Sequence, residues 1–230
     1  MKKFFMMFAA AAMTVSMASA TAVTTGSTYD YLDLFTNDGT VTVGDKLFSN
    51  FEITCTGSNC VDLTQANQVQ VQGIIEAGTH YGIQFRGAFA SIGLTDYVIT
   101  FDVDVLDPSK QIKTVGMRFN GSYTGNGFAD ITEEAFDGAL VGFLQVTNPP
   151  LVLEDTYDLQ NPINSGIPYL ASQLSIRKDM LLFGTDARNR AQVSVIDQWF
   201  VQTGEIPEPG TYAMMGAGLL ALAAIRRRKA

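Results

Sequence analysis

The sequence predicts an all-β protein, an antiparallel β-sandwich or jelly-roll-like single domain, on three observations. Apolar and polar residues alternate over many short segments, as on strands whose successive side chains point to opposite faces of a sheet. Pairs that favour hairpin turns recur between these segments, at Asp38-Gly39, Asn120-Gly121 and Asp137-Gly138. No window of about 12 or more residues in the body follows the helical period of about 3.6 residues. We expect about ten strands at this spacing.

The first 20 residues are predicted to be a secretory signal peptide. Lys2 and Lys3 form its charged region, residues 4–15 are apolar apart from one threonine, and Ala18-Ser19-Ala20 is a small-x-small cleavage site. An N-terminal membrane helix is the alternative, but about a dozen apolar residues are fewer than the roughly 20 that span a bilayer. We therefore expect an exported β-sandwich domain at residues 21–205.

Two segments show the strand alternation most clearly. In Gln68-Val69-Gln70-Val71-Gln72 the valines share one face and the glutamines share the other. In residues 97–105 five apolar side chains share one face, while a threonine, Asp102 and Asp104 share the opposite one. We expect these two aspartates to lie on a solvated outer face.

The last predicted strand of the body is less regular. Val193, Val195, Trp199 and Val201 are expected to share one side, with Asp197 as the exception on that side. The same alternation extends through two further strands, which contain Ile83 and Phe85, and Val115, Met117 and Phe119.

The two cysteines of the chain, Cys55 and Cys60, are predicted to form a disulfide bond. Turn-forming residues separate them, and an even pair in an exported protein is expected to be oxidised. The ring is short, so its contribution to stability is expected to be about 2 kcal/mol. Metal binding is the alternative, but the pair lacks the CxxC spacing and has no neighbouring histidine.

The mature body is more acidic than the whole chain. The chain has 15 Lys and Arg, 23 Asp and Glu, and a net charge of −8. Six of the basic residues and one acidic residue lie in the two terminal segments, so the body has nine basic and 22 acidic residues and a net charge of −13. Such a surface repels nucleic acid and anionic lipid, and we exclude both as direct partners.

The sequence shows no catalytic constellation, so we expect a protein that is not an enzyme and uses no cofactor. His80 is the sole histidine, and no serine lies in a Gly-x-Ser-x-Gly motif. Glu133 and Glu134 are adjacent, so on a strand they point to opposite faces rather than flanking one glycosidic bond. The same pair is also compatible with the start of a short helical turn.

Two binding functions remain as alternatives. Asp102, Asp104 and Asp107 suggest a calcium-stabilised adhesin-like domain. No Asp-x-Asp-x-Asp-Gly loop is present, so the sequence does not identify which residues would bind the metal. Trp199 and exposed tyrosines suggest stacking on sugar rings, as in a carbohydrate-binding module, although most aromatic residues of a β protein belong to its core.

Residues 206–230 have the three parts of a sorting signal. Pro207, Glu208 and Pro209 precede an apolar run at residues 212–225, and the basic residues Arg226, Arg227, Arg228 and Lys229 follow. The 14 apolar residues would reach about 21 Å as a helix, against a hydrocarbon core of roughly 30 Å, which favours a transient anchor in the inner membrane. Alone, Pro-Glu-Pro would indicate a stiff linker rather than a signal, and it is the apolar run and basic cluster after it that favour the signal.

This tail resembles the PEP-CTERM sorting domain of Gram-negative bacteria that make extracellular polysaccharide. The resemblance implies that Pro207, Glu208 and Pro209 are the motif recognised by exosortase, a membrane protease and transpeptidase, and that cleavage falls near them. It also implies a final location at the cell surface or in the extracellular matrix, with exopolysaccharide of a biofilm as a possible partner.

The body is similar to one group of PEP-CTERM proteins. The matching segments are Gly44–Phe51, Tyr81–Phe85, Asp96–Ile99, Ile131–Glu134 and Ile196–Phe200. The group is largely of unknown biochemical function, so this resemblance supports the β prediction and adds no activity.

Overall fold

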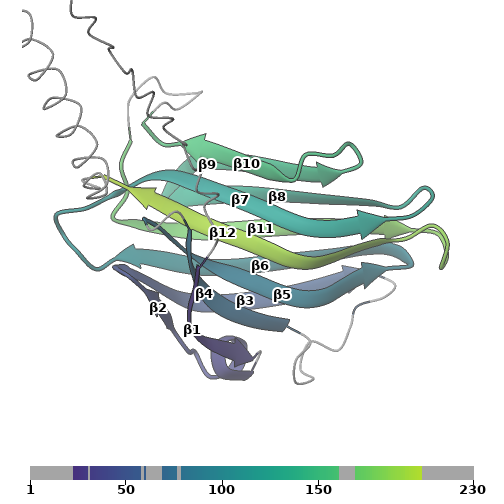
Figure 1. Ribbon diagram of the computed structural model, residues 1–230, viewed down its shortest axis with the longest axis horizontal. Coiled ribbons are helices and arrows are strands. Elements are labelled where there is room, and N and C mark those ends of the chain that lie inside the picture. Colours follow the sequence, from purple (N-terminus) through teal and green to yellow (C-terminus); the bar gives the residue numbers. More distant parts are fainter. Residues whose placement is uncertain are drawn as a thin grey trace, which may run out of the picture.

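The protein is a sandwich of two six-stranded antiparallel sheets, seen in a computed structural model (Figure 1). The structure describes residues 23–30, 32–57, 60, 69–76, 79–160 and 169–203. The predicted signal peptide and the tail at residues 206–230 lie outside these ranges. Within them, the all-β prediction is confirmed, and the one helical element is a short π-helical turn.

The strands divide equally between the sheets. The first sheet has the order β1-β4-β5-β12-β7-β10, and the second has the order β2-β3-β6-β11-β8-β9. The elements are β1 (Val23–Asp30), η1 (Leu32–Thr36), β2 (Val41–Val43), β3 (Lys46–Gly57), β4 (Val69–Glu76), β5 (His80–Ser91), β6 (Gly93–Val105), β7 (Ile112–Tyr123), β8 (Phe128–Asp137), β9 (Ala139–Asn148), β10 (Glu154–Asp158), β11 (Gln173–Gly184) and β12 (Ala191–Gln202).

The chain passes repeatedly between the two sheets. Strands β5 to β12 take the order β5-β12-β7-β10 in one sheet and β6-β11-β8-β9 in the other, which is the strand order of a jelly roll. Strands β1 to β4 extend the two sheets at one edge. Figure 1 looks onto the first sheet, with β12 and β7 in front and the second sheet behind.

The space between the sheets is filled by the inward rows of apolar side chains. On β6 the row of Tyr97, Ile99, Phe101 and Val103 is buried, as the alternation of residues 97–105 predicted. Phe85 and Phe101 pack with ring centroids 5.6 Å apart, which joins the two sheets across the core. Asp102 and Asp104 lie on the other side of β6, half-buried on the outer face.

A β-bulge makes the prediction for the last strand partly wrong. The register of β12 shifts between Val193 and Val195 relative to both of its neighbours. Relative to β7, β12 has one extra residue at this point, and the alternation of its side chains reverses there. Val193 therefore points into the core, whereas Val195, Asp197 and Trp199 point outward on the opposite face.

The turn predictions have mixed outcomes. Asp137-Gly138 joins β8 to β9, and Gly138 has a φ of 69°. Asn120-Gly121 instead lies inside β7, opposite the β12 bulge, so its prediction as a hairpin is wrong. Asp38-Gly39 follows η1 and precedes β2. Glu133 and Glu134 lie in β8 rather than at the start of a helical turn.

The described part of the chain contains no helix of a length and apolarity that would cross a membrane. The predicted hydrophobic helix at residues 212–225 lies outside that part.

Candidate functional site

The outer face of the first sheet has a tryptophan at its centre. Trp199 on β12 is paired with Gly82 of β5 and Gly116 of β7. A Cβ atom at Gly116 would lie 2.2 Å from the indole ring, so the ring lies directly over this glycine. Trp199 is only 4% exposed, yet it does not belong to the core cluster between the sheets.

An arginine on β7 covers the tryptophan and joins several strands. The guanidinium carbon of Arg118 lies 5.6 Å from the indole centroid, within the range of a cation–π interaction. The Arg118 nitrogens lie 2.8 Å from Asp197 on β12, 2.8 Å from Glu76 on β4 and 3.9 Å from Glu154 on β10. Arg118 therefore links four strands of one sheet.

The electrostatic balance around Arg118 favours its charged form. Burial alone lowers the pKa of Arg118, but hydrogen bonds to Asp197 and Glu76 outweigh this effect and raise the pKa above its ordinary value. The arginine side chain remains 32% exposed, so it can still exchange partners with a ligand. Gln84 on β5 adds an amide that donates a hydrogen bond to Asp197 at 2.6 Å.

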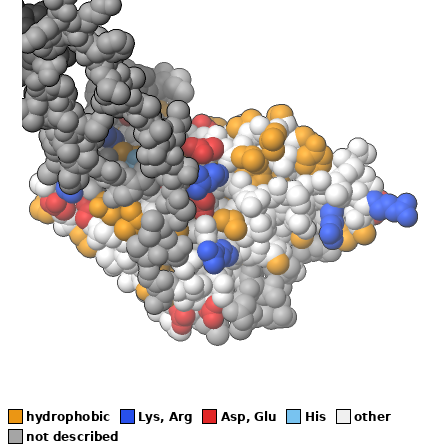
Figure 2. Space-filling view, viewed as in Figure 1, with side chains coloured by type: hydrophobic (Ala, Val, Ile, Leu, Met, Phe, Trp, Pro, Cys, Tyr) orange, Lys and Arg blue, Asp and Glu red, His pale blue; other side chains and the backbone are white. Residues whose placement is uncertain are grey.

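Two hollows flank this cluster, which we call the Arg118 cluster (Arg118, Glu76, Asp197 and Glu154). The larger hollow has a volume of about 580 Å³ and the smaller about 300 Å³. The larger is lined by Gln84, Arg86, Arg118, Phe119, Asn120, Leu153, Val195 and Asp197, and the smaller by Glu76, His80, Thr114, Glu154, Thr156, Trp199 and Val201. Figure 2 shows acidic and basic side chains side by side near the middle of this face, with hydrophobic side chains toward β10.

The arrangement suits a ligand with many hydroxyl groups. Carboxylates accept hydrogen bonds, whereas guanidinium and amide groups donate them in fixed planar directions. Leu153 and Val195 supply an apolar wall beside these groups in the larger hollow. An open, partly apolar surface with a few convergent polar side chains is typical of a binding site.

The sequence-predicted residues lie in different places. Trp199 and His80 both line the smaller hollow. Asp102 lies on the outer face of the other sheet, where it accepts a hydrogen bond from Asn50 at 2.7 Å. Among the described residues, no three His, Cys, Asp or Glu side chains lie close enough together to hold a metal ion.

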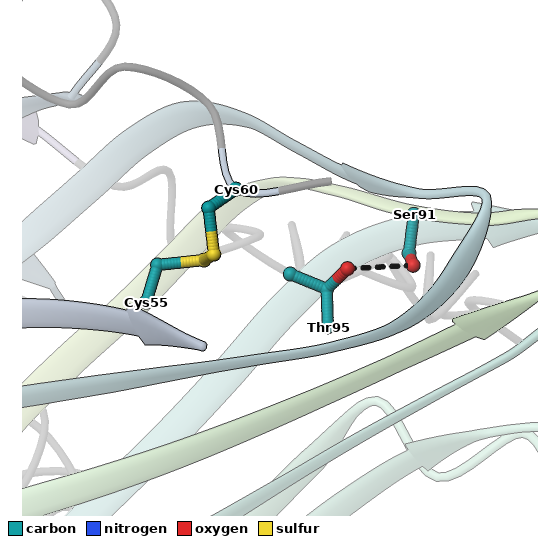
Figure 3. Close-up of a disulfide and its surroundings, with 4 residues drawn as sticks. All are labelled: Cys55, Cys60, Ser91 and Thr95. Atoms are coloured by element: carbon teal, nitrogen blue, oxygen red, sulfur yellow. Dashed lines mark hydrogen bonds between the residues drawn. A yellow bond between two sulfur atoms is a disulfide. The ribbon is translucent and has the colours of Figure 1, made fainter. Parts of the chain in front are cut away.

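The predicted disulfide is present between Cys55, on β3, and Cys60 (Figure 3). Their Cα atoms are 5.7 Å apart. Figure 3 also shows the turn from β5 to β6, where the hydroxyls of Ser91 and Thr95 are hydrogen-bonded at 2.9 Å. The disulfide therefore lies at the end of the sandwich that contains the turn from β5 to β6, away from the Arg118 cluster.

Sequence reasoning missed most of the outer-face site. Arg118 was not singled out, because it occupies an ordinary outward position between apolar residues of β7. Glu76 and Gln84 were missed for the same reason. The two glycines paired with Trp199 would have pointed to the site. Gly116 and Gly82 can be matched to Trp199 only once the strand register is known, so the sequence alone does not show this signal.

The comparisons with known proteins give a family match in the tail and one solved structure of low similarity. The family model of the PEP-CTERM protein-sorting motif matches residues 205–229, which confirms the predicted sorting motif. No curated protein matches the chain. One solved structure, of TmCBM61 in complex with β-1,4-galactotriose, is similar over 67% of this chain and 88% of its own, with 10% identity and a TM-score of 0.34.

Proposed function

We propose that this chain is an exported, non-enzymatic surface protein whose tail is processed by an exosortase and whose sandwich binds extracellular polysaccharide. The match of residues 205–229 to the PEP-CTERM protein-sorting motif carries the first part. The match includes Pro207, Glu208 and Pro209 and the basic residues at 226–229. In this account the tail holds the protein transiently in the inner membrane before its release to the cell surface or matrix of a biofilm.

The outer face of the first sheet supports the second part. The hollows on both sides of Arg118 lie on one open face, so an extended polymer could occupy both by crossing the strands. Arg118 and Asp197 would exchange part of their mutual hydrogen bonding for sugar hydroxyls, and Leu153 would pack against the C–H face of a ring. The body has a net charge of −13, which favours a neutral polysaccharide over an acidic one.

Replacing Pro207, Glu208 and Pro209 with alanine tests the sorting part. We expect the variant to accumulate in the membrane fraction with its tail attached, because the processing enzyme no longer recognises it. Cell fractionation and mass analysis of the C-terminal peptide give the readout. Unchanged processing and location would contradict the proposal.

Retention of the purified full chain on the host's own extracellular polysaccharide tests the binding part. We expect saturable binding that weakens about tenfold or more in Arg118→Ala, which corresponds to about 1.4 kcal/mol. Arg177→Ala is the matched control, since Arg177 is a partly exposed, ion-paired arginine on the outer face of the opposite sheet. Absence of retention, or an equal loss in both variants, would rule out this face as the binding site.

A further inference from the structure

A lysine lies in the apolar interior of the sandwich. Lys178 occupies the inward row of β11 between Ile176 and Met180, and its side chain is fully buried. Its register partner on β8 is Glu133, which is also fully buried. Gln198 reaches the same point from β12 in the facing sheet and has no exposed surface either.

The three side chains form a closed triangle of contacts. The Lys178 Nζ contacts both Oε2 of Glu133 and Oε1 of Gln198. The Gln198 Nε2 donates a hydrogen bond to Oε1 of Glu133 at 3.0 Å. The Sδ of Met117 lies 3.4 Å from the same Lys178 nitrogen, on the apolar side of the cluster. One carboxyl group therefore touches the amine with one oxygen and the amide nitrogen with the other.

Fold stability alone gives little reason for this cluster. Burying two charges costs several kcal/mol per ion, and apolar residues of similar volume often stabilise a core as well or better. Burial lowers the pKa of Lys178 and raises the pKa of Glu133, although each partner opposes the shift of the other. Both directions shift the pair toward its neutral forms, and the neutral form of an amine is the nucleophile.

The geometry points to an intramolecular amide bond that forms between Nζ of Lys178 and Cδ of Gln198, with Glu133 as the proton carrier and ammonia as the leaving group. This cross-link is independent of the proposed glycan binding, because it lies between the sheets rather than on the outer face of either.

Each step balances with groups that the cluster already holds. The Lys178 nitrogen adds to Cδ of Gln198, and a proton passes from that nitrogen to Oε2 of Glu133. In the same step the protonated acid gives the proton on its Oε1 to Nε2 of Gln198, so Glu133 carries one proton before and after the transfer; the Cδ–Nε2 bond then breaks and ammonia leaves. One amine and one primary amide become one secondary amide, and no oxidant or reductant is required.

The bond would join the two sheets through their centres. Strand β11 lies between β6 and β8, and β12 lies between β5 and β7. Lys178 and Gln198 are 20 residues apart, so the bond would close a ring that contains the connection between these two strands. For a surface protein, this link would hold the sheets together when the chain is pulled or partly unfolded.

Peptide mass spectrometry of the full chain tests the bond. After denaturation and digestion with trypsin, we expect a branched peptide in which residues 178–188 are attached to the peptide that begins at Ala191. Its mass should lie about 17 Da below the sum of the two linear peptides, the mass of one ammonia. Recovery of Lys178 and Gln198 in linear peptides alone would overturn the proposal.

Two variants assign the roles within the triangle. Glu133→Gln should abolish the branched peptide, whereas its neighbour variant Glu134→Gln should leave it unchanged, because Glu134 faces outward on the same strand. Gln198→Ala should also abolish it. Full cross-linking in Glu133→Gln would overturn the role given to Glu133, and a branched peptide in Gln198→Ala would overturn the identity of the acceptor.

Discussion

Among the residues that the structure describes, two lysines are fully buried, and they differ in what surrounds them. Lys178 and Lys46 both extend from the second sheet into the interior, and both contact a glutamine side chain of β12, Gln198 or Gln202. Each amine also contacts a carboxyl group. A lysine, a glutamine and an acidic residue therefore meet at two places along β12.

The carboxyl group and the aromatic neighbour distinguish the two places. Glu133, beside Lys178, has no exposed surface, whereas the Asp45 side chain beside Lys46 is 18% exposed. The Lys46 Nζ also lies 5.5 Å from the centroid of the Tyr81 ring, which stabilises an ammonium ion. In our proposal, burial of the acid together with the amine prepares Lys178 for reaction, whereas Lys46 is paired with the partly exposed Asp45.

The largest expected effect on stability is that of replacing Glu133, and replacing its neighbour Glu134 on β8 should have a much smaller one. Glu133→Gln should lower the free energy of unfolding by about 3–5 kcal/mol, because it prevents the cross-link and leaves Lys178 buried without a carboxyl group. Glu134→Gln should cost less than about 1 kcal/mol, since Glu134 and its partner Arg177 are both partly exposed to solvent. Guanidinium unfolding followed by the fluorescence of the single tryptophan measures both. Equal losses of unfolding free energy in the two variants would contradict the role that we give to the buried Glu133.

The disulfide offers a second covalent link for comparison. Replacing Cys55 and Cys60 together with serine should cost about 2 kcal/mol, because the ring that the bond closes is short. Thermal unfolding measures this loss, which should be smaller than that of Glu133→Gln. The yield of the branched peptide should stay the same, and a reduced yield would mean that the two links are coupled.

Replacing the other buried lysine, Lys46, should reduce stability by less than replacing Glu133. Lys46→Met should cost about 1–2 kcal/mol, because Asp45 loses its charged partner but keeps access to water. The Lys178 cross-link should persist in this variant. Urea unfolding gives the first value and peptide mass spectrometry the second. Loss of the cross-link would show that the two lysine sites act together rather than separately.

The smallest effect is expected on the outer face. Arg118→Ala should cost about 1 kcal/mol, because its ion pairs with Glu76 and Asp197 are partly open to water. Its main consequence should be the loss of polysaccharide binding. Thermal unfolding and binding, measured on the same samples, separate the two roles. A loss of stability as large as that of Glu133→Gln would make Arg118 a structural residue instead.

Much of the fold could be predicted from the sequence. The alternation of residues 97–105 gave the faces of β6 correctly, because the register shift between β3 and β6 leaves the extra residue in β3 and not in β6. Cys55 and Cys60 were paired correctly from their spacing and the predicted export. The tail was recognised from three consecutive segments that need no tertiary structure, and the PEP-CTERM match covers it.

The errors came from tertiary structure. The β12 bulge at Val193 to Val195 places Trp199 on the face opposite to Val193, and the period of one strand cannot reveal an extra residue relative to β7. Asn120-Gly121 looked like a hairpin because the pair favours turns, but it lies opposite that bulge within a continuous strand.

The buried lysine could not be predicted for a related reason. Arg177, Lys178 and Asp179 are three consecutive charged residues, and such a run is typical of a solvated strand. Only the positions of Ile176 and Met180 on either side indicate that Lys178 points inward. Its partners Glu133 and Gln198 come from other strands, so the triangle appears only when both sheets are in place.

The most direct test compares the two lysines within one tryptic digest of the denatured, reduced full chain. We predict complete cleavage after Lys46, with a linear peptide beginning at Leu47, and no linear peptide beginning at Lys178 or Asp179. The material from the second site should appear instead in the branched peptide that contains Gln198. Linear peptides from both sites in equal yield would contradict the claim that Lys178 forms an amide bond.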